Sequence, residues 1–172
     1  MGLKYKNGDE VSDSIGLLIS ILVRYPEVAT INYEPQSHVL RFAFMSSRVL
    51  SDVEGKILGD NIISCLETFN FLEARQAQVI RLEHSRCDNV TVLEVQRDVE
   101  TLTGEEIALI IALMHQEFPG ELVADENDSL MEEDLLMQEE LIGHMLENMK
   151  GAIPEKKLIA FREEGRVLVF NK

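Results

Sequence analysis

Apolar residues recur at two different spacings along this chain. In four stretches they are three or four residues apart, and in six shorter stretches they alternate with polar residues or form β-branched runs. The first spacing indicates amphipathic helices and the second indicates strands. We therefore expect four helices and three β-hairpins, in the order α, ββ, α, ββ, α, α, ββ.

The helix boundaries are predicted by capping residues and by proline. Thr103 and Glu106 have the spacing of a capping box, and Pro26 and Pro119 end two of the apolar patterns. The expected helices run from Ser12-Asp13-Ser14 to Arg24, from near Ser51 or Asp52 to Leu72, from Thr103 to the residue before Pro119-Gly120, and from about Leu130 to Met149.

The strands are expected in pairs around short polar turns. Gly165 suits a left-handed turn position, and Asp88-Asn89 supplies turn chemistry. The expected strands are Thr30–Glu34 with His38–Met45, Ala77–His84 with Val90–Arg97, and Leu158–Arg162 with Arg166–Phe170. Hairpins make antiparallel pairs, and apolar helices need a common surface to cover. The fold class is therefore α+β, an antiparallel sheet built from helix-hairpin units with the helices mainly on one face.

The pattern also predicts which helix faces are buried. The second helix has one apolar stripe, on which Cys65 is expected to be inert packing. Gly55 and Gly59 at its edge indicate either close packing or a later helix start. The third helix has apolar residues on two sides, with Leu109 and Leu113 nearly opposite Ile107, so it needs cover on both. The stripe of the second helix comprises Leu58, Ile62, Cys65, Leu66, Phe69 and Leu72.

Charge is concentrated in one part of the chain. The 52 residues from Asp98 to Met149 contain 15 Asp or Glu and no Lys or Arg, so they account for the whole net charge of −15. This charge argues against nucleic acids and anionic lipids as partners, because both bind through Lys and Arg. The apolar runs 15–23 and 107–114 are much shorter than the roughly 20 residues of a membrane span. A single domain over residues 1–172 is expected, with an acidic connecting segment at about 119–130.

Two features indicate a cytoplasmic protein. Cys65 and Cys87 form no disulfide framework and no paired metal-ligand spacing, which favours a reducing compartment. The first residues have no apolar segment typical of a signal peptide.

The fourth helix carries the main functional hypothesis. Its apolar stripe indicates core packing, but Met137 lies off that stripe and predicts exposed apolar surface. Four of the seven methionines, those at positions 131, 137, 145 and 149, lie here, and flexible thioethers suit varied partners. We expect a basic or amphipathic protein partner. The predicted partner-binding residues are Glu132, Glu133, Leu136, Met137, Glu139, Glu140, Met145 and Met149.

A divalent-metal site on the same helix is the alternative. Glu140, His144 and Glu147 are spaced i, i+4 and i+7 and project from one side, with Asp125 or Asp128 as additional ligands. No second such motif exists in the chain, as a dimetal helical bundle would need. A solvated charged face explains the same spacing.

The sequence therefore predicts a non-catalytic cytosolic interaction module: an adaptor, regulator or chaperone-like binder. The alternative is a metal-binding protein or metal-dependent enzyme. We expect no cofactor and no catalytic residue, since Cys87, beside Arg86, has no accompanying base or oxyanion motif. A homo-oligomer is compatible with the two-sided third helix and with an open edge at the last hairpin.

Overall fold

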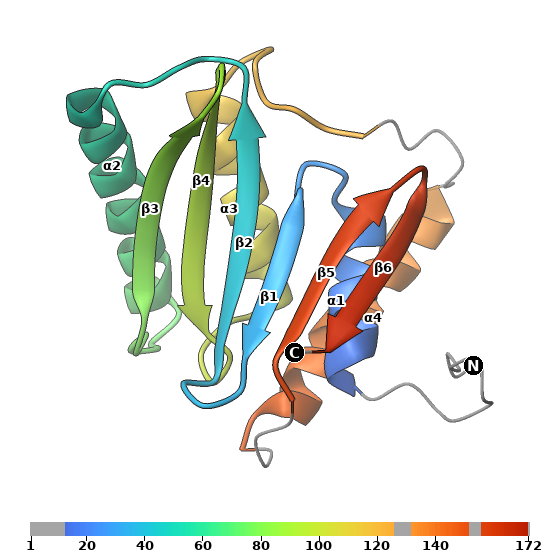
Figure 1. Ribbon diagram of the computed structural model, residues 1–172. Coiled ribbons are helices and arrows are strands. Elements are labelled where there is room, and N and C mark those ends of the chain that lie inside the picture. The colour runs from blue at the N-terminus through green and yellow to red at the C-terminus, as the bar shows by residue number, and fades with distance from the viewer. Residues whose placement is uncertain (1–12, 126–131, 152–155, 172) are drawn as a thin grey trace.

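The computed structural model describes residues 13–125, 132–151 and 156–171. Four helices cover one face of a six-stranded antiparallel sheet, as predicted (Figure 1). The order of elements along the chain is also the predicted one. The elements are α1 Asp13–Arg24, β1 Thr30–Glu34, β2 Val39–Ser46, α2 Asp52–Leu72, β3 Ile80–Cys87, β4 Val90–Asp98, α3 Gly104–Glu117, α4 Glu132–Met149, β5 Leu158–Glu163 and β6 Arg166–Asn171.

The sheet joins the three hairpins side by side in the order β3-β4-β2-β1-β5-β6. Every neighbouring pair is antiparallel. The central hairpin β1–β2 joins the other two, because β2 pairs with β4 and β1 pairs with β5. β3 and β6 are therefore the two edge strands.

Alternation along the strands separates the two faces of the sheet. Phe42 pairs with Ile31 on one side and with Val95 on the other, and all three are buried beneath the helices. Residues between them face the opposite way, as a period of two requires. The helix-covered face therefore holds the core, to which all four helices contribute buried side chains.

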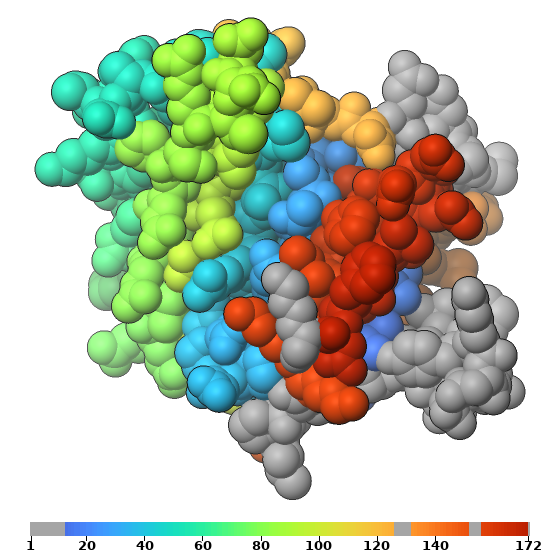
Figure 2. Space-filling model, in the orientation of Figure 1, coloured from blue at the N-terminus to red at the C-terminus, as the bar shows by residue number. Residues whose placement is uncertain are grey.

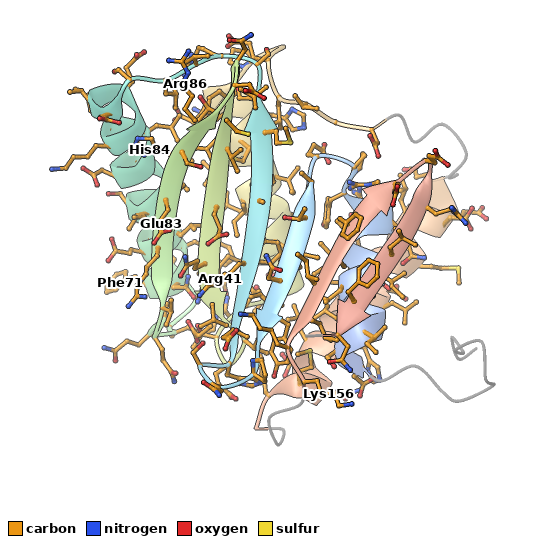
Figure 3. The ribbon with its side chains drawn as sticks, viewed as in Figure 1. Arg41, Phe71, Glu83, His84, Arg86 and Lys156 are labelled. Carbon is orange, nitrogen blue, oxygen red and sulfur yellow. The ribbon has the colours of Figure 1, made fainter. Side chains whose placement is uncertain are left out.

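None of the described helices lies over the second face of the sheet (Figure 2). Arg41 of β2 and Glu83 of β3 lie on this open face (Figure 3). At the other end of the sheet, Phe161 and Phe170 stack with ring centroids 5.6 Å apart. The open face therefore changes from charged near β3 to aromatic near β6.

Helix α2 begins at a complete capping box. The Glu54 amide donates to the Ser51 hydroxyl, and the Ser51 amide donates to the Glu54 carboxylate at 3.1 Å. The helix thus starts ahead of Gly55 and Gly59, which excludes the late start that these glycines also allowed. A Cβ on Gly55 would lie 2.4 Å from His84 Nε2 of β3. The glycines therefore serve close packing.

Helix α3 has only half of its predicted capping box. The Thr103 hydroxyl accepts the amide of Glu106 at 3.2 Å, as expected for the N-cap. The Glu106 side chain does not return to Thr103; it forms a buried ion pair with Arg97 of β4. An unpaired buried guanidinium costs far more than an exposed helix-end amide, so the ion pair takes precedence.

The β3–β4 hairpin differs from the prediction at both ends. Strand β3 runs on to Cys87, so the turn consists of Asp88 and Asn89 alone, with Asp88 at φ 55°. At its start, the strand begins at Ile80 and not at Ala77. The amides of Gln78 and Val79 donate to the Asp98 carboxylate at 3.0 and 2.9 Å, and so do not join the ladder.

Among the described residues, no helix combines the length and the apolar character needed to cross a bilayer.

Candidate interaction surface on the helical face

Helix α4 packs along α1 and against α3. Its buried side consists of Ile142, Met145, Leu146 and Met149. A glycine allows the close approach to α1, because the Met145 sulfur lies 2.9 Å from where a Cβ on Gly16 would be. Gly104 of α3 faces Gly143 at an ordinary contact distance. The apolar stripe of this helix therefore contributes mainly to the core.

The outward side of α4 combines apolar and acidic residues. Leu136, Met137 and Leu141 are large and exposed, Met137 to 62%. Glu132, Glu133 and Glu140 are also exposed, and the helix contains no Lys or Arg. The exposure of Met137 confirms what its position off the stripe predicted.

Three of the predicted partner-binding residues have structural contacts. Glu139 accepts from the Arg24 guanidinium at 2.6 Å and so ties α4 to α1. Met145 and Met149 are 6% and 4% exposed and lie in the core. Their burial favours the core-packing interpretation that the stripe also allowed, and it leaves five of the eight residues on the surface: Glu132, Glu133, Leu136, Met137 and Glu140.

The alternative metal residues do not assemble into a site. Glu140, His144 and Glu147 are all exposed, and Glu147 contacts Lys150 at 2.7 Å. Asp125 lies 3.6 Å from Arg162 of β5, and Asp128 is outside the described residues. Within residues 13–125, 132–151 and 156–171, no three His, Cys, Asp or Glu side chains are placed to hold a metal ion.

A buried polar cluster that the sequence did not reveal joins β4, α2 and α3. Arg97 is fully buried and donates to the carboxylates of Glu106 and Asp98. The Asn70 amide of α2 donates to Glu106 at 3.2 Å, and its oxygen accepts from Arg97 at 3.4 Å. The cluster therefore fixes the C-terminal half of α2 against the first turn of α3. The only sequence feature that could have predicted the burial of Arg97 is its place in the alternating pattern of β4, at a position that faces the core.

An apolar groove of about 380 Å³ lies between α2 and α3. The expectation that Cys65 is packing was wrong, because its thiol is free and exposed in this groove. The α2 stripe is wider than the surface that α3 and the sheet cover, so only its Leu58, Ile62 and Leu66 side is buried. The residues that line the groove are Ser64, Cys65, Thr68, Phe69 and Leu72 of α2 and Leu109 and Leu113 of α3.

The helical layer and the sheet differ in charge. The four helices contain 14 Asp or Glu and two Lys or Arg. The six strands contain five Asp or Glu and six Arg. Because all helices lie on one face of the sheet, that face of the molecule is acidic and the sheet is nearly neutral (Figure 1).

Comparison with known proteins gives no match: no family model, no curated protein and no solved structure matches the chain.

Proposed function

We propose that this protein is a non-catalytic interaction module, an adaptor, regulator or chaperone-like binder, whose α4 face engages a basic or amphipathic protein partner. The observation that carries the proposal is the outward side of α4, where Leu136, Met137 and Leu141 are exposed beside Glu132, Glu133 and Glu140. Exposed apolar side chains grouped in this way are typical of binding surfaces. The partner's apolar residues contact the three large side chains.

The charge of the helices supports a positively charged partner. A helical face with many carboxylates and few cations attracts basic partners over a distance of about 8–10 Å at physiological salt. Steering of this kind raises the association rate, whereas apolar contact lengthens the lifetime of the complex. The partner is thus bound by two separable effects.

The proposal extends to compartment and assembly. Cys65 and Cys87 are both free and exposed, which is compatible with a reducing cytoplasm. The position of β6 at the edge of the sheet is compatible with a homo-oligomer. The native mass of the purified protein measures the oligomeric state.

The test uses a fluorescent synthetic peptide of about 14 residues with Leu and Lys at helical spacing, which presents one apolar and one basic face. The variant changes Glu132, Glu133 and Glu140 to Gln and leaves the structural Glu139 intact. We expect its affinity for the peptide to fall about tenfold at low salt, with the difference shrinking as salt screens the charges. Fluorescence anisotropy measures the affinity at both salt concentrations.

The matched control makes the same charge change on other surfaces. Glu83, Glu163 and Glu164 are exposed on β3 and the β5–β6 hairpin, and the control changes these three to Gln. An equal loss of affinity for the peptide in both triple variants would show that net charge alone determines binding. It would refute a specific binding surface on α4.

A further inference from the structure

We infer that the groove between α2 and α3 is a second binding surface: it takes an amphipathic helix whose apolar side chains are flanked by Lys or Arg. This inference rests on the proposed function, an interaction module for basic amphipathic partners, and adds a second site to the α4 face. It concerns a surface that is separate from the α4 face in its residues and can be tested separately.

The length of the groove matches that of a short helix. Its α2 wall runs from Ser64 to Leu72, a rise of about 12 Å at 1.5 Å per residue. Leu109 and Leu113 form the opposite wall, one helical turn apart. Two to three turns of a partner helix cover this length. Amphipathic helices commonly bind by placing their apolar face in a hydrophobic groove of this kind.

Two large apolar side chains are exposed at the C-terminal end of α2. Leu72 is 75% exposed and Phe71 is 80% exposed, and Figure 3 places Phe71 on the β3 side of the molecule. Burying large apolar side chains of this kind against a partner removes them from water and lowers the free energy. Leu72 belongs to the groove, whereas Phe71 lines a separate hollow together with Gln78 and Ile80.

A buried cluster of hydrogen bonds holds the two walls of the groove at a fixed distance from each other. The Arg97 cluster joins Asn70 of α2, which follows the groove residue Phe69, to Glu106 of α3, about one turn before the groove residue Leu109. Because the cluster is buried and hydrogen-bonded, closing the groove by moving α2 toward α3 would disrupt it. The groove is thus a preformed surface, which lowers the cost of binding.

The charges around the groove select a basic occupant. None of the seven lining residues is charged. The exposed polar surface of the two helices beside it carries Asp60, Glu67 and Glu105, against the cation Lys56. Just after α2, Glu73 is exposed and Arg75 lies over the Phe69 ring at 5.8 Å from its centroid. An apolar strip with acidic surroundings is complementary to a helix whose apolar face has basic flanks. A second copy of this chain has acidic helices and is not complementary.

The two cysteines allow a direct footprint. Cys65 lies in the groove, and Cys87 ends strand β3 next to the β3–β4 turn; both thiols are free and exposed. The experiment measures the rate at which iodoacetamide modifies each cysteine, by mass spectrometry, with and without the Leu/Lys peptide. We expect saturating peptide to slow modification of Cys65 about tenfold and to leave Cys87 unchanged.

Three substitutions of exposed apolar residues distinguish the two possible binding surfaces. Leu72→Ser alters the groove, Leu136→Ser alters the α4 face, and Val53→Ser removes a 69% exposed side chain of α2 outside both. We expect Leu72→Ser to raise about tenfold the peptide concentration that protects Cys65, with Val53→Ser unchanged. Thermal unfolding checks that each variant is folded.

The outcomes distinguish the two proposals. Peptide binding that depends on the α4 glutamates but leaves Cys65 fully reactive would refute the groove and keep the α4 face. Protection of Cys65 with unchanged affinity in the α4 glutamine variant would keep the groove and refute the α4 face. Absence of peptide binding at low salt would refute both. Protection of Cys65 that appears without peptide, in a protein of dimeric mass, would assign the groove to a second copy instead.

Discussion

At the scale of single residues, the absence of one Cβ determines how closely α2 lies on the sheet. Gly55 faces the His84 ring, whose three nearest atoms would be 2.4–2.5 Å from an added Cβ. Gly143 in the middle of α4 has no such neighbour within 4 Å. Gly55, in the first turn of α2, is therefore tightly packed, whereas Gly143, in the middle of α4, is not.

Alanine at these positions is expected to act in opposite directions. Gly55→Ala forces the His84 ring or the helix to move and should destabilise the protein by about 1–3 kcal/mol. Gly143→Ala adds a methyl group in open space and should stabilise it by up to about 1 kcal/mol through helix propensity. Urea denaturation of both variants measures the free energy of unfolding, and a stabilising Gly55→Ala would show that α2 is not held in close contact.

Asp98 links folding to pH. Burial raises the pKa of its carboxyl, but hydrogen bonds from Val79, Thr101 and Gln78, together with the charge of Arg97, outweigh burial and lower the pKa below its usual value. A carboxyl with a lowered folded-state pKa contributes stability above its unfolded pKa, near 4, and loses it as the pH falls through the folded pKa.

Asp98→Asn should therefore destabilise the protein most at neutral pH, and its difference from wild type should shrink as the pH falls below about 4. Denaturation between pH 7 and pH 3 measures this, with Asp60→Asn on the exposed face of α2 as the control. A difference that stays constant over this range would mean that the Asp98 charge has no part in folding.

Residue positions were predictable where one helix face decides them. Met137 is exposed as expected, because its angle on α4 opposes the core. Cys65 was predicted to be buried because a helical wheel gives the direction in which a side chain points. It does not give how much of that side of α2 the neighbouring helix α3 covers. The covered area depends on the distance between α2 and α3, and contacts between residues far apart in the sequence set that distance.

At the scale of elements, the Arg97 cluster joins β4, α2 and α3. Removal of one partner from a buried ion pair leaves an uncompensated charge and typically costs 3–5 kcal/mol. We expect Glu106→Gln to cost about that much, measured by urea denaturation, and to raise Cys65 reactivity by loosening α2 from α3. Replacing both partners, in Arg97→Met with Glu106→Leu, should recover part of the loss.

A second ion pair between helices serves as the control. Arg24 and Glu139 join α1 to α4 at 2.6 Å, but both side chains are partly exposed. Glu139→Gln should therefore cost less than about 1 kcal/mol. Similar losses for Glu106→Gln and Glu139→Gln would contradict the special role of the buried cluster.

Element boundaries were predictable where local chemistry sets them. The start of α2 and the hairpin around Gly165 follow directly from cap and turn residues, and Gly165 has the expected positive φ of 77°. The start of β3 was not predictable, because it depends on the Asp98 carboxylate nineteen residues or more along the chain. The second half of the α3 capping box failed for a similar reason, since a distant arginine binds its glutamate.

At the scale of the whole molecule, the fold class was predictable from periodicity, whereas the order of the strands was not. Each hairpin forms from neighbouring segments, but the pairs β2–β4 and β1–β5 join segments separated by whole helices. The acidic block from Asp98 to Met149 was visible in the sequence as well. Its placement on one side of the molecule depends on α3 and α4 covering the same face as α1 and α2.

This separation of charge across the two layers gives the protein an electric dipole roughly perpendicular to its sheet, with the helices at the negative end. Near a positively charged surface, whether a protein or a chromatographic resin, such a dipole restricts rotation before contact. The molecule therefore arrives with its helices first. The sheet, with the stacked rings of Phe161 and Phe170, is then left facing the solvent.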